Sequence, residues 1–240
     1  MNNPFAAFGI THLSASTLNT FAASPAMFVI EKVLKRRQPV GASAHRGTAT
    51  EAGVAAFLMG NATVAEAQEI ALKEFDRLTA LSGDPRRATE RARPELDSHF
   101  VKQTAALGKI EHWFEGVAVP LIGYYDFKWD DHGILVDLKS QLKLASEINV
   151  AHARQVALYV ADTNYSARIA YVTPKKHAVY QLENARAHLE SLRRIAMACQ
   201  AFCAVSSNPD DLVAITAPDV SSYFFSDPVA RATAYEVYGV

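Results

Sequence analysis

A short polar turn between two alternating segments constrains the fold of this 240-residue chain more than any other feature. The segments on either side of it alternate apolar and polar side chains, as β-strands do. If Asp130 pairs with Gly133 across the turn, the antiparallel register places Asp126 directly opposite Asp137. Lys139, two residues after Asp137, then points to the same face of the strand. The sequence therefore predicts a β-hairpin with two acids and an amine on one face.

Two carboxylates in directly opposed positions need a physical reason to stay together. Opposed Cβ atoms lie about 4.5–5.5 Å apart, and like charges there repel. Such a pair is tolerated when one carboxyl is protonated or when a cation bridges the two. Asp126, Asp137 and Lys139 thus predict a divalent-metal site with a basic group beside it. The carbonyl of Leu138 is a further candidate ligand, while its side chain points to the opposite face and into the core.

A site of this kind suits phosphodiester hydrolysis. Mg²⁺ or Mn²⁺ held by carboxylates polarises a phosphoryl oxygen and acidifies bound water, and Lys139 is placed to orient that water or stabilise developing charge. Magnesium prefers a few carboxylates together with water and substrate oxygens. The alternative is a surface hairpin whose acids and lysine are merely exposed, because Asp-x-Lys is a short pattern that recurs by chance.

The amino-acid composition limits the classes of protein to which the chain can belong. Half of the residues are hydrophobic, mean hydropathy is near zero and no apolar run reaches 18 residues, so we expect no membrane span. The formal net charge of -1 means that nucleic-acid binding would depend on local basic patches. The first residues lack the pattern of a secretory signal, which favours a cytoplasmic protein. Cys199 and Cys203 are expected to be buried apolar residues, since an iron–sulfur cluster usually takes four thiols.

Hydrophobic periodicity predicts helices first, then strands, then helices again. The expected helices cover residues 16–37 with a break at Pro25, 46–60, 63 or 64 to 81, 93–107, 147–162, 183–205 and a segment after Asp227-Pro228. The expected strands cover residues 110–119, 121–129, 134–139, 168–172 and 178–181. Ser16 is the expected cap of the first helix. This order indicates an α/β or α+β fold and not the βαβ alternation of a dinucleotide-binding domain.

Five short motifs follow one another in an order that resembles a known family. Residues 13–19, with Pro25 and Phe28, resemble an opening helix signature, and residues 46–53 resemble a helical motif in which a glycine precedes a metal ligand, here Glu51.

Three further motifs lie in the middle of the chain. Residues 123–126 match an acidic motif, residues 137–140 match D-x-K, and Gln155 with Tyr159 matches Gln-x-x-x-Tyr. Together the five motifs make the chain similar to the PD-(D/E)XK nuclease superfamily, in particular to its RecB-like branch.

The resemblance implies a restriction-endonuclease-like core, with a central mixed β-sheet flanked by helices and a helical N-terminal region. It implies one nuclease domain over residues 1–240: a mainly helical region (1–108) carrying the Glu51 motif, a βββαβ catalytic core with a closing helix (109–206), and a C-terminal extension (207–240).

The resemblance also implies residue roles. Asp126 and Asp137 would be metal ligands for Mg²⁺ or Mn²⁺, with Lys139 as the catalytic lysine, and Glu51 would be an additional metal ligand or a water-orienting acid. Many RecB-like members have histidine where this chain has Glu51. Gln155 and Tyr159, whose i, i+4 spacing places them on one helix face, would contact DNA or brace the site.

The DNA-contacting surface should be locally basic. Lys143 and Arg154 flank the predicted site in the sequence and are the preferred candidates, together with Ser140 of the D-x-K motif. His152 and His177 are expected to be ordinary surface residues.

The leading interpretation is a metal-dependent DNA nuclease, and the resemblance favours an exonuclease acting in recombination, repair or phage genome processing. The chain resembles the stand-alone nucleases of phages. This resemblance implies a protein that works in the host cytoplasm, either as a homo-oligomer or with a recombination partner. Neither the four-cysteine cluster of CRISPR-associated relatives nor a phosphate-binding motor loop is present. One alternative is a non-catalytic nucleic-acid-binding or scaffold subunit on the same fold. Another is a small-molecule hydrolase, which is disfavoured because the chain has no nucleophile motif such as G-x-S-x-G.

Overall fold

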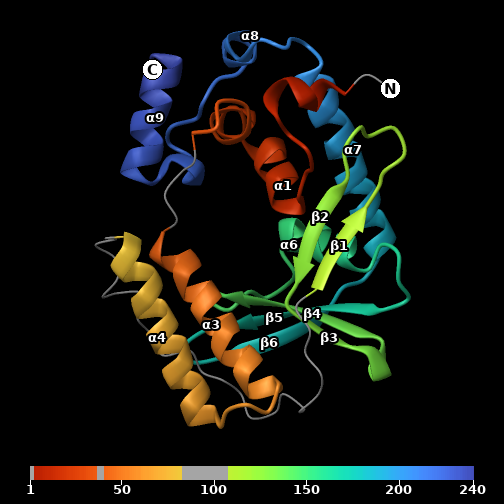
Figure 1. The fold of residues 1–240 in the computed structure, drawn as a ribbon, viewed down its shortest axis with the longest axis vertical. Coiled ribbons are helices and arrows are strands. Elements are labelled where there is room, and N and C mark those ends of the chain that lie inside the picture. The colour runs from red at the N-terminus through yellow and green to blue at the C-terminus, as the bar shows by residue number, and fades with distance from the viewer. Residues whose placement is uncertain (1–2, 37–40, 83–107) are drawn as a thin grey trace. The chain divides into compact units, whose positions relative to one another are not determined.

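The computed structural model describes residues 3–36, 41–82 and 108–240 (Figure 1). Contacts divide the chain into two compact units. Unit 1 comprises residues 1–39, 110–123 and 186–240, and unit 2 comprises residues 40–109 and 124–185. The expected helix over 93–107 lies outside the described residues. That the chain forms a single nuclease domain stays a prediction.

Unit 2 contains a four-stranded mixed sheet in the order β3-β4-β5-β6 (Figure 1). The strands are β3 (Phe127–Trp129), β4 (Ile134–Ser140), β5 (Ser166–Val172) and β6 (His177–Gln181). The β3–β4 and β5–β6 pairs are antiparallel, and the β4–β5 pair is parallel. The predicted mixed α/β architecture is confirmed.

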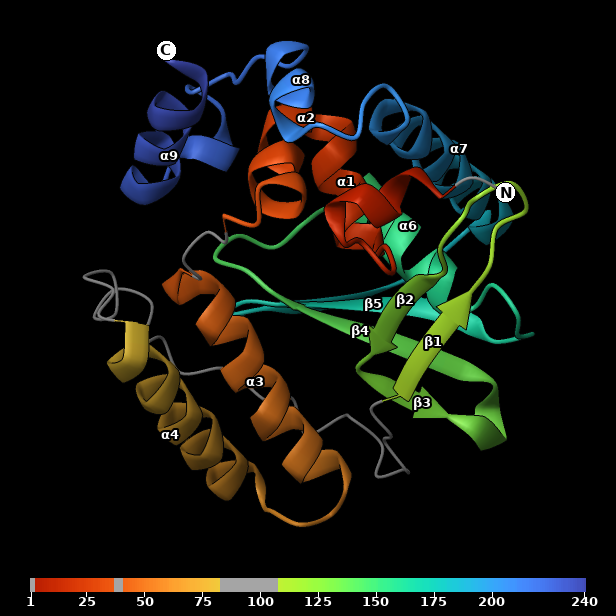
Figure 2. The same cartoon turned by 45° about the horizontal axis from the view of Figure 1, so that its top comes forward.

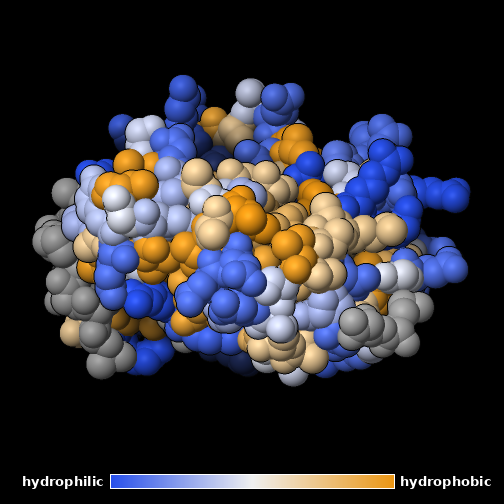
Figure 3. Space-filling model, turned by 90° about the horizontal axis from the view of Figure 1, so that it is seen from above, coloured by the Kyte–Doolittle hydropathy of each residue, from blue (hydrophilic) through white to orange (hydrophobic). Residues whose placement is uncertain are grey.

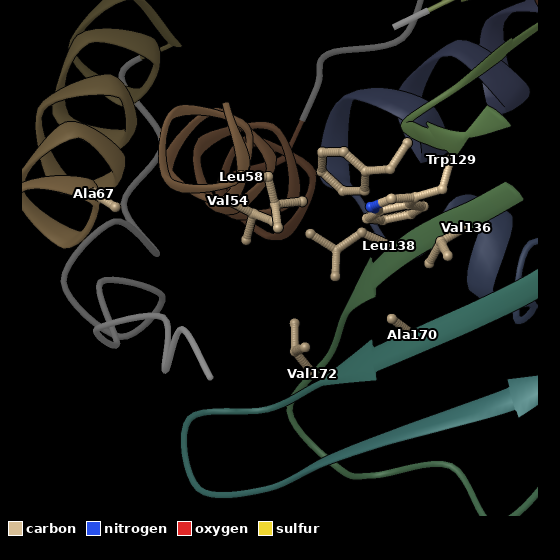
Figure 4. Close-up of a cluster of buried hydrophobic side chains, with 9 residues drawn as sticks. Val54, Leu58, Ala67, Trp129, Val136, Leu138, Ala170 and Val172 are labelled. Carbon is tan, nitrogen blue, oxygen red and sulfur yellow. The ribbon is translucent and has the colours of Figure 1, made fainter. Parts of the chain in front are cut away.

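One face of this sheet packs on the hairpin of α3 (Ala42–Leu58) and α4 (Val64–Ser82). Val54 and Leu58 of α3 contact Leu138 and Val172 of the sheet in a common core (Figure 4). The side chain of Leu138 therefore enters the core, as the strand alternation predicts. A Cβ on Gly53 would lie 2.6 Å from a backbone oxygen of α4, so glycine is required where the two helices meet.

The other face of the sheet bears Asp137, Ile169 and Tyr171, since side chains alternate along a strand. Helix α6 (Val150–Tyr159) packs against β4 and β5, and Figure 2 shows α3 and α6 on different sides of the strands. Asn149 caps α6 by accepting the N–H of Ala151, so the helix begins later than the predicted residue 147.

Unit 1 is mainly helical. Its helical elements in the described residues are η1 (Pro4–Phe8), α1 (Ala15–Ala23), α2 (Pro25–Phe28), the π-helical turn η2 (Val29–Val33), α7 (Ala185–Cys203), α8 (Pro209–Ala214), η4 (Tyr223–Phe225) and α9 (Pro228–Tyr238). Met27 and Ile30 from the first part of the chain share a core with Phe225, Ala230 and Ala234 from the last. The C-terminal segment is therefore part of the packing of unit 1.

The predicted first helix is divided into three pieces. Ser14, not Ser16, caps α1 by accepting the N–H of Thr17, and Ser24 caps α2 with Pro25 in its first turn. Proline at the first helical position starts a new helix because its missing N–H has no partner there in any case. The prediction of a break at Pro25 is confirmed, and the assignment of Ser16 as the cap is wrong.

The predicted strand over 110–119 is also shorter than expected. Only β1 (Gly108–His112) forms, and it pairs with β2 (Leu121–Tyr125) in a separate two-stranded sheet. The connecting residues instead form an irregular loop that is held by Gln200 of α7, whose side chain bonds Gly116 O and Ala118 N. Alternation alone did not reveal that these backbone groups pair with a side chain.

No helix in the part of the chain that the structure describes is long and apolar enough to cross a membrane. The face in Figure 3 mixes hydrophobic and hydrophilic side chains. Exposed apolar residues of unit 1 include Ile215, Tyr223 and Val229. Scattered apolar side chains are common on protein surfaces and do not define a binding site.

Candidate active site

The β3–β4 hairpin has the register that the sequence predicts. Phe127 pairs with Val136 and Trp129 with Ile134, and Gly133 closes the turn by donating its N–H to Asp130 O over 3.2 Å. Gly133 has a φ of 57°, a left-handed conformation that glycine adopts without strain. The predicted nine-residue strand 121–129 is interrupted at one point, Asp126, which lies at a bend between β2 and β3.

This bend turns the side chain of Asp126 towards β4. Its Oδ2 accepts the backbone N–H of Leu138 over 2.7 Å. A carboxylate that replaces the expected ladder contact keeps the two strands joined while one carboxylate oxygen remains free of that bond. The hairpin therefore brings Asp126 beside Asp137, although Asp126 itself is not in a strand.

Asp137 is the most deeply buried charged residue of the described chain, at 1% exposure. Lys139 Nζ lies 2.7 Å from Asp137 Oδ2, and the lysine side chain is 23% exposed. This contact is an ion pair to Oδ2, while among the described residues no hydrogen-bond donor reaches Oδ1. Buried carboxylates normally accept several hydrogen bonds, so Asp137 retains unused acceptor capacity.

Glu51 approaches the two aspartates from α3. Burial raises its pKa, and the charge of Asp137 raises it further, while Lys139 acts in the opposite direction. Burial likewise raises the pKa of Asp126 to about 7, with added repulsion from Asp137 and then Glu51. Burial raises the pKa of Asp137 too, and Lys139 opposes that shift. Three carboxyl groups therefore share one region with one ammonium group.

Tyr159 and Gln155 of α6 complete this region. The Gln155 side-chain amide donates to the Tyr159 hydroxyl, so the predicted i, i+4 pair does face one side of the helix. Burial raises the pKa of Tyr159, and the charges of Asp137, Asp126 and Glu51 add to the shift. The tyrosine hydroxyl therefore stays protonated beside the carboxylates and is available as a hydrogen-bond donor.

The predicted DNA contacts are less uniform. Lys143 is exposed in the loop after β4, and Arg154 is half-buried on α6. The hydroxyl of Ser140 is buried and has no hydrogen-bond partner among the described residues; it would lie 3.5 Å from a Cβ on Gly47. Their roles in DNA binding stay predictions.

His152 and Tyr171 belong to the same neighbourhood, and the sequence analysis missed them. His152 is half-buried on α6, so its assignment as a surface residue is wrong, whereas His177 is exposed as expected. The spacing of His152 from Gln155 and Tyr159 places all three residues on one face of the helix, and this spacing could be read from the sequence. Tyr171 is the register partner of Lys139 across the parallel β4–β5 pair, which strand alternation alone cannot reveal.

The donor set fits a divalent cation of the magnesium type. The described residues contain no group of three or more carboxylate, imidazole or thiol side chains that would enclose a metal by themselves. Mg²⁺ does not need such a cage, because it retains water and takes substrate oxygens. Asp137 has unused buried oxygens, and the pKa of Asp126 is raised. A cation between the two carboxylates would lower their mutual repulsion.

A mixed sheet that carries two aspartates and a lysine is the arrangement that the sequence analysis expects of a metal-dependent nuclease. A family model described as the PD-(D/E)XK nuclease superfamily matches residues 12–212, and the chain belongs to this superfamily. Its members generally use divalent metals and act on DNA. The superfamily predicted from the motifs is thereby confirmed.

Other comparisons add little. A solved structure titled "Crystal structure of SSO0001" aligns with a TM-score of 0.33 and 12% identity, covering 77% of this chain and 85% of that chain. A likeness at this level carries no argument. No curated protein matches the chain.

Proposed function

We propose that this chain is a Mg²⁺- or Mn²⁺-dependent deoxyribonuclease of the RecB-like branch that degrades DNA from an end. The observation that carries the proposal is the buried Asp137, paired with Lys139 and placed beside Asp126. A buried carboxylate with open acceptor positions destabilises a fold, so its presence calls for a functional reason.

Asp126, Asp137 and Glu51 would hold the metal, with the carbonyl of Leu138 as a further ligand. When bound, such a metal polarises a phosphoryl oxygen and acidifies its water. Lys139 would supply a positive charge where negative charge develops on the phosphate. Tyr159, which stays protonated, offers a neutral donor beside the carboxylates.

The Gln155–Tyr159 hydrogen bond supports the RecB-like assignment, because it shows the two motif residues acting as one unit on α6. DNA would follow the basic side chains of Lys143 and Arg154 and pass Ser140. A role in recombination, repair or phage genome processing, alone as a homo-oligomer or with a recombination partner, follows from the same resemblance.

The test is cleavage of DNA labelled at one end, offered as a linear duplex and as a closed circle, with Mg²⁺, Mn²⁺ or a chelator. We expect metal-dependent loss of the linear DNA and an intact circle. Nicking of the circle would contradict the exonuclease assignment while keeping the nuclease. DNA binding without hydrolysis under any metal condition would identify a non-catalytic scaffold subunit instead.

The matched variants are Asp137→Asn and Asp131→Asn. Both remove one carboxylate from the same hairpin, but Asp131 is exposed in the turn (η3, Asp130–His132). We expect the first to abolish cleavage and the second to leave it unchanged. Equal activity of the two variants would contradict the site assignment.

A further inference from the structure

The stripe of α6 that carries Gln155 and Tyr159 extends one turn towards the start of the helix, where it reaches His152. Residues spaced by three and by seven lie on one face of a helix, so the three side chains follow each other along the same stripe. His152 lies near Lys139, whose charge lowers the pKa of the imidazole after the larger effect of burial, to about 4. The imidazole is therefore neutral at physiological pH.

The hydroxyl of Tyr171 orients this imidazole. Tyr171 is completely buried, and its ring is tilted against that of His152 with centroids 5.7 Å apart. Its hydroxyl oxygen accepts the backbone N–H of Asn149 over 3.2 Å and lies 2.8 Å from His152 Nδ1. The hydroxyl thus has one donor partner and one partner that either donates or accepts.

The tautomer of His152 follows from where the hydroxyl proton goes. A buried hydroxyl needs an acceptor for its proton, and among the described residues His152 Nδ1 is the acceptor within reach of Tyr171. Nδ1 is then unprotonated, and in a neutral imidazole the proton resides on Nε2. Tyr171 thereby converts His152 into a fixed Nε2–H donor.

This Nε2–H has no hydrogen-bond partner among the described residues. By comparison, Nε2 of His45 is buried and has no hydrogen-bond partner within the described ranges. A donor on a half-buried side chain that Tyr171 orients and that lies near the charge of Lys139 is placed where a negatively charged oxygen would be stabilised. Half or more of protein–DNA hydrogen bonds go to phosphate and sugar oxygens, commonly from N–H groups.

We propose that His152 binds a backbone phosphate of the DNA substrate through Nε2–H, with Tyr171 as the residue that positions it. This inference rests on the proposed function and adds a substrate-binding residue to it. Because the donor is neutral, its contribution does not depend on the counterion release that accompanies lysine and arginine contacts.

The experiment uses the two amides that imitate the two ring nitrogens. His152→Gln places an amide N–H near the position of Nε2, whereas His152→Asn keeps a polar group near Nδ1 and Tyr171 but loses the outer donor. Binding is measured by fluorescence anisotropy of a labelled short duplex in Ca²⁺, with His177→Asn as the surface control. A melting curve for each variant shows that it is folded.

We expect His152→Gln and His177→Asn to bind DNA like the wild type, and His152→Asn to bind about tenfold more weakly or worse, since hydrogen bonds to charged groups carry the larger energies. Tyr171→Phe should weaken binding by a smaller factor, because it frees the tautomer without removing the imidazole. The opposite order of the two His152 amides would assign His152 to a purely structural contact with Tyr171 and overturn the proposal.

An independent readout is the histidine ¹⁵N–¹H spectrum of the protein without DNA, which distinguishes Nε2–H from Nδ1–H. The Nδ1–H form, or the charged imidazolium at neutral pH, would contradict the inference. A wild-type protein that cleaves DNA while His152→Asn binds it normally would remove this inference alone. A wild type that neither binds nor cleaves DNA with any metal would remove the proposed function as well.

Discussion

Gln200 in unit 1 is half-buried and Asp137 in unit 2 is fully buried, and the two polar side chains differ in how their hydrogen-bonding groups are satisfied. Gln200 Nε2 donates to Gly116 O over 2.9 Å, and its Oε1 accepts the N–H of Ala118 over 2.7 Å. Asp137 is more deeply buried, yet among the described residues its Oδ2 meets only the ammonium group of Lys139 and its Oδ1 has no donor.

The difference separates a polar group that stabilises a fold from one that the fold tolerates. The two hydrogen bonds of Gln200 hold a loop that precedes it in the sequence by more than 80 residues. Asp137 instead carries a buried charge, and among the described residues Lys139 is the group that offsets its desolvation. Residues that weaken their own fold in this manner cluster at functional sites.

The largest expected effect is on catalysis by Lys139→Ala. Removing the ammonium group takes away the positive charge beside the reacting phosphate, and we expect the cleavage rate to fall by about 10²–10³-fold. The measurement is single-turnover cleavage of end-labelled DNA at saturating Mn²⁺. Retention of more than a tenth of wild-type activity would show that Lys139 is not part of the centre.

The next effect is on stability and its dependence on pH. The pKa of Asp126 is raised from its usual 3.8 to about 7, so the folded protein holds this proton more tightly than the unfolded chain. The resulting stability is fully present below about pH 3.8 and is lost as the pH rises through about 7. Between pH 5 and pH 8 the loss amounts to about 3 kcal/mol for such a group.

Asp126→Asn isolates this contribution, because the amide oxygen can still accept the N–H of Leu138. Without metal, we expect the variant to lose less stability than the wild type between pH 5 and pH 8, measured by urea unfolding at both values. Added Mg²⁺ should stabilise the wild type and not the variant. Parallel pH profiles for the two proteins would mean that burial and the neighbouring carboxylates do not raise the pKa of Asp126.

The smallest effect is on Gln200→Ala in unit 1. The change leaves Gly116 O and Ala118 N–H without their partner, and we expect a loss of about 1–2 kcal/mol of stability. Cleavage at saturating DNA should remain at the wild-type rate. Gln181→Ala, an exposed position at the end of β6, is the control and should melt like the wild type. If Gln200→Ala lost activity while its melting temperature stayed unchanged, Gln200 would be a functional residue and not a stabilising one.

The local geometry of the site was predictable because it depends on short-range rules. The turn that ends in Gly133 fixes the register of β3 and β4, and strand alternation then fixes which side chains share a face. This places Asp137 with Lys139 and sends Leu138 into the core, as the structure shows. The bend at Asp126 was not predicted, because alternation continues through it.

The rest depends on contacts that sequence periodicity does not encode. The π-helical turn at Val29–Val33 and the placement of α9 in the core of unit 1 arise from packing between the two ends of the chain. The parallel register that sets Tyr171 beside Lys139 is fixed only when β4 and β5 are aligned. The positioning of His152 therefore became visible only in the structure.

The central claim is that Asp126 and Asp137 bind one divalent cation in the folded protein. Electron paramagnetic resonance of Mn²⁺ titrated into the wild type, Asp137→Asn, Asp126→Asn and the control Asp131→Asn measures this directly, without DNA. We predict bound Mn²⁺ in the wild type and the control and greatly weakened binding in the two site variants. Equal Mn²⁺ binding by all four proteins would contradict the claim.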